Sequence, residues 1–213
     1  MAICLGEAGR LNGTGKLKRD NMGQFVIPFC VLLGSYLFQD GIILPLEMLF
    51  RHDGYEHLVS LMFIPHGVKV ALVLIFGLRA FPAIFTAQLT NGLILQNILN
   101  FNSYIILGAL AGTLCFLFPL LAHNIFFRQP LYSGPIFQKT GTRNSLLLFL
   151  SFAFAASVLN SLFHAALHGF KIELLAVMYL FGDVFGAIVI FILFILIFRL
   201  YVLRMVTRGA YHD

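Results

Sequence analysis

Charged side chains are scarce in this sequence. Asp, Glu, Lys and Arg make up 11% of its 213 residues, whereas 60% of the residues are hydrophobic and the mean hydropathy is +0.92. Because about a quarter of the residues in an ordinary soluble domain are charged, this shortage excludes that class. The sequence therefore predicts an all-α integral membrane protein, and its length suits one helical bundle better than two domains.

Tryptophan is absent, so Tyr alone is left to occupy any aromatic belt at the membrane interface. The three cysteines are an odd number without metal-like spacing, which predicts neither a disulfide framework nor a metal or other cofactor. No small-residue cleavage site follows the first apolar run, so we expect a retained helix and not a signal peptide. The net charge of +5 needs no nucleic-acid partner. No activated nucleophile follows from any spacing, so we expect no enzyme activity.

Long apolar runs dominate the sequence. About 20 apolar residues cross a bilayer, and the chain has six such runs, at roughly 24–45, 58–78, 81–99, 103–126, 144–169 and 174–198. If the N-terminus is cytoplasmic, the inner segments collect 11 of the 14 basic residues, as the positive-inside rule requires. We therefore predict about six transmembrane helices with both termini in the cytoplasm: a tail over 1–23, the membrane domain over 24–198 and a short tail over 199–213.

A carboxylate lies inside the last apolar run. Counting helical rise from Leu174 places Asp183 about 14 Å into the membrane, where an ionisable group costs about 3 kcal/mol and needs a partner. Counting from His57 places His66 at the same depth, about 14 Å. Lys69 follows one turn later on the same helix face. We expect His66 and Lys69 to face Asp183 and to form a ligand-binding site with it. An equally open alternative is a structural Asp183–Lys69 ion pair that only holds two helices together.

Further polar residues fall on other predicted spans. Asp40 lies in the first span, Asn91 in the third with Gln88 and Gln96, and the fifth has a stripe of Asn160, His164 and His168. The spacing of the two histidines suits a metal, but a strong third ligand is missing. One polar cavity open to the outer side would satisfy all of these groups, although the amides also suit ordinary interhelical hydrogen bonds. The candidate ligand-binding residues are Asp183, His66, Lys69, Asp40, Asn91 and His164.

Two motifs carry a family resemblance. The second and third spans are almost contiguous, which predicts a tight helical hairpin with its corner at Gly77, Arg79 and Pro82. The segment from Phe63 to Pro82 resembles the signature hairpin of the membrane-associated sensor domain of the first type (MASE). The matching places are taken by Pro65, Gly67 or Val68, Gly77, Arg79 and Pro82. The segment from Tyr179 to Gly186 resembles the late Trp-x-x-Gly-Asp-x-x-Gly helix of that family, with Gly182 and Gly186 in the glycine places. This sequence departs from the family in two respects. Another residue replaces tryptophan in both motifs, and the family generally has about eight spans, whereas six are predicted here.

The resemblance implies a multi-pass sensory module of the bacterial inner membrane. Such a module binds a small ligand or a proton and passes its state on, here to a separate signalling protein, because no kinase or cyclase motif occurs in the sequence. Membrane lipid is the other expected partner. The alternative is a substrate-binding subunit or a small transporter for a metabolite, since a membrane-embedded polar cavity suits transport as well.

Overall fold

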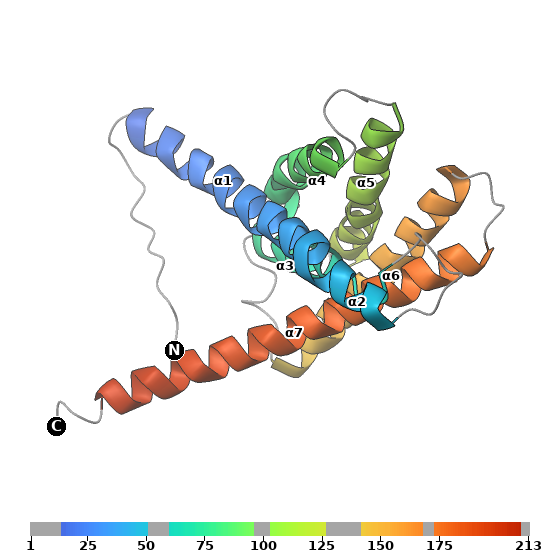
Figure 1. Cartoon of the computed structure of the whole chain (residues 1–213). Coiled ribbons are helices and arrows are strands. Elements are labelled where there is room, and N and C mark those ends of the chain that lie inside the picture. The colour runs from blue at the N-terminus through green and yellow to red at the C-terminus, as the bar shows by residue number, and fades with distance from the viewer. Residues whose placement is uncertain (1–13, 51–59, 96–102, 127–141, 168–172, 210–213) are drawn as a thin grey trace.

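The computed structural model describes residues 14–50, 60–95, 103–126, 142–167 and 173–209, and all regular elements in these ranges are helices (Figure 1). They are α1 (Thr14–Phe38), the π-helix η1 (Gln39–Ile43), α2 (Leu44–Phe50), α3 (Ile64–Phe76), the 3-10 helix η2 (Gly77–Ala80), α4 (Phe81–Leu95), α5 (Ser103–Phe126), α6 (Thr142–Leu167) and α7 (Glu173–Gly209). The predicted all-α class is confirmed for these residues.

Five helical stretches in the described residues are long and apolar enough to cross a membrane. They are Met22–Leu49, Ile64–Leu95, Ser103–Ile125, Leu146–Leu167 and Val177–Ile197. The predicted second and third spans both fall in the stretch Ile64–Leu95, which contains α3, η2 and α4. The chain is thus a multi-pass helical bundle.

The predicted corner between α3 and α4 lies at Gly77. Its φ of 61° and ψ of −140° end α3, and glycine adopts a positive φ without the steric strain that a side chain would cause. Arg79 in η2 donates from Nη1 to Oε1 of Gln24 at 2.9 Å, so the corner lies beside the early part of α1. Pro82 occupies the first turn of α4, where its missing N–H costs no hydrogen bond.

The free ends of the hairpin both contact η1, which directly follows α1. The Ile64 N–H at the start of α3 donates to Oε1 of Gln39 at 3.0 Å. Asn91 in α4 donates from Nδ2 to Oδ2 of Asp40 at 3.3 Å. Since the corner lies near Gln24, α3 runs antiparallel to α1 and α4 runs parallel to it.

Helix α3 is the centre of the bundle. Every residue from Ile64 to Leu74 is buried, because α1, α5, α6 and α7 all pack against this helix. The predicted span 58–78 is wrong at its start, since residues 60–63 are not helical. His66 therefore lies in the first turn of α3, and the depth obtained by counting a helix from His57 is wrong for it.

Helix α7 runs without a break over 37 residues, about 55 Å at helical rise, which exceeds the roughly 30 Å of a membrane core. The predicted non-membrane tail from residue 199 is helical as far as Gly209. Residues Ile192 to Ile197 are all exposed, and Figure 1 shows this half of α7 extending away from the other helices. Only the first half of α7 thus packs into the bundle.

Candidate functional site

The buried carboxylate of α7 contacts a histidine of α3. Nδ1 of His66 lies 3.1 Å from Oδ2 of Asp183, and the two side chains are 0% and 1% exposed. The ring is turned so that this approach lacks the angle of a hydrogen bond, and Nδ1 has no other partner. Asn160 of α6 donates from Nδ2 to the same Oδ2 at 2.7 Å. Three helices thus meet at one carboxylate oxygen.

The other ring nitrogen of His66 contacts α6. Nε2 lies 3.1 Å from Oγ of Ser157, which also donates to the backbone carbonyl of Ala153 at 2.8 Å. The sequence analysis missed Ser157. Its spacing from Asn160 and His164, three and seven residues, puts it on the predicted polar face of this helix and could have revealed it.

Lys69 does not pair with Asp183. Its ammonium lies over the rings of Tyr36, Phe63 and Phe116, with Nζ 5.9, 5.8 and 5.3 Å from the ring centroids. With the amide of Gln88 oriented to satisfy its neighbours, the amide oxygen accepts from Lys69 Nζ at 3.0 Å. A cation over several aromatic faces is stabilised by the ring quadrupoles. The ammonium is therefore held by α1, α4 and α5, and the simple Asp183–Lys69 ion pair is absent.

The helices that carry His66 and Asp183 pack through glycines. A β-carbon on Gly67 would lie 2.7 Å from both Cα of Ala187 and the carbonyl oxygen of Gly186. A β-carbon on Gly186 would overlap the carbonyl of Phe63, whose own N–H donates to the carbonyl of Gly182 at 2.9 Å. We call these contacts between Gly67, Gly182, Gly186, Ala187 and Phe63 the glycine seam. It brings together the two segments that resemble the MASE motifs.

Asp40 and Asn91 form a second polar pair, which also contacts the end of α1. Asp40 is half-buried in η1, and Asn91 is 7% exposed with its Oδ1 unpaired. A π-helical turn changes the direction of the side chains that follow it, and such turns are frequent at functional sites. No contact joins this pair to His66 or Asp183 among the described residues, so the single shared cavity expected from the sequence is divided between two groups of residues.

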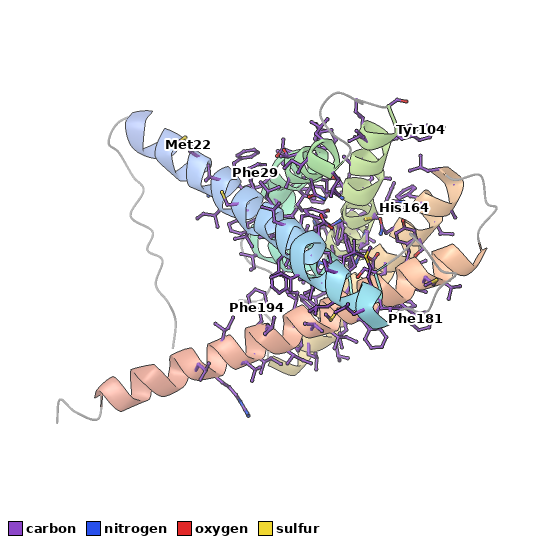
Figure 2. All side chains as sticks on the ribbon, in the orientation of Figure 1. Met22, Phe29, Tyr104, His164, Phe181 and Phe194 are labelled. Atoms are coloured by element: carbon purple, nitrogen blue, oxygen red, sulfur yellow. The ribbon has the colours of Figure 1, made fainter. Side chains whose placement is uncertain are left out.

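His164 lies one turn beyond Asn160 on α6 and stacks on Tyr179 of α7, with ring centroids 4.6 Å apart and planes 10° from parallel. Tyr179 is one turn before Asp183. The predicted stripe of α6 therefore faces α7 and leads from the Asp183 carboxylate toward the ends of these two helices. His168 and Gln96 fall outside the described residues. Figure 2 labels His164 among the side chains of this region.

Glu47 lies in α2 and contacts the segment before α3. Its Oε1 accepts from Oγ of Ser60 at 2.8 Å and from the N–H of Met62 at 3.0 Å, and its Oε2 accepts from the N–H of Leu61 at 3.1 Å. Gln39 completes this network by donating to Ser60 Oγ at 2.8 Å. These bonds hold the non-helical segment before α3 against η1 and α2, which no sequence pattern had indicated.

The cluster around Asp183 is closed in this structure. His66, Asp183 and Lys69 are at most 2% exposed, so the opening to the outer side stays a prediction. Besides Oδ1 of Asn91, two buried oxygens of the described residues have no hydrogen-bond partner, Oδ1 of Asp183 and Oγ of Ser161. An unpaired buried polar atom costs about 1–3 kcal/mol, so both atoms favour a bound donor. In the part of the chain that the structure describes, no three metal-ligating side chains gather.

Comparison with known proteins gives no relative: no protein-family model, no curated protein and no solved structure matches the chain. The resemblance to the MASE domain thus depends on the two motifs alone. A function has to be inferred from the geometry of the buried cluster and of the helices that carry it.

Proposed function

We propose that this protein is a membrane sensory module that binds a small ligand or a proton at the buried His66–Asp183 pair. Helix α7 then passes the bound state to a separate signalling partner. The resemblance of two segments, Phe63 to Pro82 and Tyr179 to Gly186, to the MASE domain supports this proposal.

One observation carries the proposal. Among the described residues, the contact between His66 of α3 and Asp183 of α7 is the one that joins ionisable side chains of these two helices, and it lies beside the glycine seam. A ligand that changes the His66–Asp183 contact changes the packing of two backbones already at their closest approach. Because packed interfaces have discrete arrangements, a small change of charge there selects between states. Helix α7 carries that change along an unbroken helix as far as Gly209.

The proposal includes the finer topology: six spans in a bacterial inner membrane with both termini in the cytoplasm. It predicts that Tyr104, 61% exposed at the start of α5, lies outside, and that Leu200, 60% exposed on α7, lies inside. Single cysteines at these positions, in a background without Cys4 and Cys30, are treated with a membrane-impermeant maleimide on intact cells. Labelling of Tyr104→Cys alone is expected, and labelling of Leu200→Cys alone would contradict this topology.

Ligand binding is tested by thermal shift of the detergent-purified protein against a panel of small metabolites and across pH. A ligand at 100 times its Kd adds about 2.7 kcal/mol to the native state, which is readily detected. The shift should vanish in Asp183→Asn and persist in Asp40→Asn, because Asp40 contacts Asn91 and not the cluster. A shift lost only in Asp40→Asn would contradict the site. Uptake of the same labelled metabolite into cells would indicate the transport alternative.

A further inference from the structure

Ser157 determines which nitrogen of the neutral His66 ring carries hydrogen. The serine hydroxyl has one hydrogen, and it is donated to the carbonyl of Ala153 at 2.8 Å. The 3.1 Å contact between Ser157 Oγ and His66 Nε2 therefore needs its hydrogen from the ring. His66 is thus protonated at Nε2, and in the neutral ring Nδ1 has only a lone pair.

That nitrogen lies close to a carboxylate oxygen, although it does not point at this oxygen in the ring orientation of this structure. Nδ1 is 3.1 Å from Asp183 Oδ2, so an ionised Asp183 and a neutral His66 place two acceptors beside each other in a buried site, without a hydrogen bond between them. One added proton removes this conflict once the ring turns toward Oδ2, either on Nδ1 as an imidazolium that donates to Oδ2, or on the carboxyl as an acid that donates to Nδ1. Without it, Nδ1 has no hydrogen-bond partner.

We infer that the ligand of the proposed sensor is a single proton shared between Nδ1 of His66 and the carboxyl of Asp183, and that its release loosens the glycine seam. This inference rests on the proposed function, since it names the ligand of the same site. The inference extends the proposed function by specifying the tautomer of His66 and the number of protons bound.

The charged and titratable groups around the pair explain why this proton is exchangeable. They come from several helices: Tyr36 of α1, Lys69 of α3, Cys115 of α5 and Tyr179 of α7. Helices α4 and α6 present the neutral amides of Gln88 and Asn160. Lys69 is the only lysine among these named groups, and its ammonium lies over aromatic rings without direct contact to Asp183. It acts on the carboxylate only through its charge, whereas the shared proton lies at the carboxylate itself.

The position of the pair couples the proton to the backbone. His66 precedes Gly67, and Asp183 lies between Gly182 and Gly186, so the proton site and the seam share the same turns of α3 and α7. When the proton leaves, Nδ1 of His66 and Oδ2 of Asp183 are two acceptors 3.1 Å apart that repel each other, and the backbones of Gly67 and Ala187 next to them are already in close contact. Release therefore separates α3 from α7.

A polar route between α6 and α7 leads to the pair. Ser161, with its unpaired Oγ, is next to Asn160, which contacts Asp183. The stacked rings of His164 and Tyr179 are half-buried one turn further on. The proton leaves the pair along this route, accepted by water at the end of the two helices.

The test is a pH titration of the full chain in lipid nanodiscs. Nitrogen-15 NMR of labelled histidine reports the His66 ring, and infrared spectroscopy reports the carboxyl group of Asp183. We expect one protonation step in which Nε2 stays protonated throughout and only the Nδ1–Asp183 pair changes. The step should be absent in His66→Gln and Asp183→Asn, and retained in His123→Gln, a matched control at the end of α5.

Ser157→Ala keeps the test decisive if those two variants fail to fold. Without the serine acceptor, His66 is free to carry its hydrogen on Nδ1 and donate to Asp183 as a neutral ring, so the step should move or disappear. A wild-type ring protonated on Nδ1 at all pH values, or the absence of any step, would overturn the inference.

Spin labels on Leu107→Cys of α5 and Leu200→Cys of α7 separate the two proposals. A protonation step with an unchanged label distance supports the proton site but contradicts both the loosening of the glycine seam and signalling through α7. A metabolite that changes the distance without any protonation step supports the proposed function and overturns the proton as its ligand. Both changes at the same pH support both proposals.

Discussion

Gly67 of α3 and Ala187 of α7 are in contact at the backbone: a β-carbon on Gly67 would lie 2.7 Å from the Ala187 Cα. Close approach of this kind requires small residues on both helices, as in other membrane helix pairs. It also sets His66 beside Asp183, since each is within four residues of the contact. The closest backbone packing and the buried charge thus occupy one place in the bundle.

Replacing Gly67 by Ala should destabilise the protein by about 1–3 kcal/mol, the usual cost of overpacking, because the new methyl group meets backbone that cannot rotate away. The measurement is unfolding of the detergent-solubilised protein by increasing SDS. Gly108→Ala in α5 is the matched control, since nothing lies within 4 Å of its β-carbon position. Equal stability of the two variants would show that the seam is not tightly packed.

Glu47→Gln should release the segment before α3. The glutamine amide keeps one acceptor oxygen where the carboxylate has two, so either Leu61 or Met62 loses its backbone partner. Loss of a charge-assisted bond of this kind costs about 1.5–3 kcal/mol. Hydrogen exchange measured by mass spectrometry should be faster over residues 60–63. Met48→Gln, a change at the exposed neighbour, should leave the exchange unchanged.

Lys69→Met should shift proton release from the His66–Asp183 pair to higher pH. Without the ammonium, the shared proton is the only counter-charge left for Asp183, so the pair keeps it longer. The infrared titration of Asp183 measures this shift. A shift to lower pH would mean that Lys69 holds the proton in place.

His164→Gln should slow proton exchange without moving the midpoint of the titration. The imidazole stacks on Tyr179, one turn before Asp183, and so lies on the expected route between the helix ends and the pair. Time-resolved infrared spectroscopy after a pH jump measures the rate. The variant His123→Gln should exchange at the wild-type rate, and an unchanged rate in His164→Gln would place the route elsewhere.

Hydropathy alone predicted a multi-pass helical membrane protein, and the hairpin corner at Gly77 followed from its composition. Both are local properties, since a bilayer requires apolar helices and a positive φ requires glycine. The structure also brings His66 to Asp183, but for a reason that differs from the prediction. Depth was counted along a helix from His57, whereas α3 begins only at Ile64.

Tertiary structure decided the partners. Whether Lys69 meets a carboxylate or three aromatic rings depends on how α1, α4 and α5 rotate around α3, and no spacing along one helix encodes that rotation. The π-helical turn at Gln39 and the reach of Glu47 to Leu61 depend in the same way on contacts between distant segments. The sequence determined which polar groups must be buried, and packing alone determined which of their atoms meet.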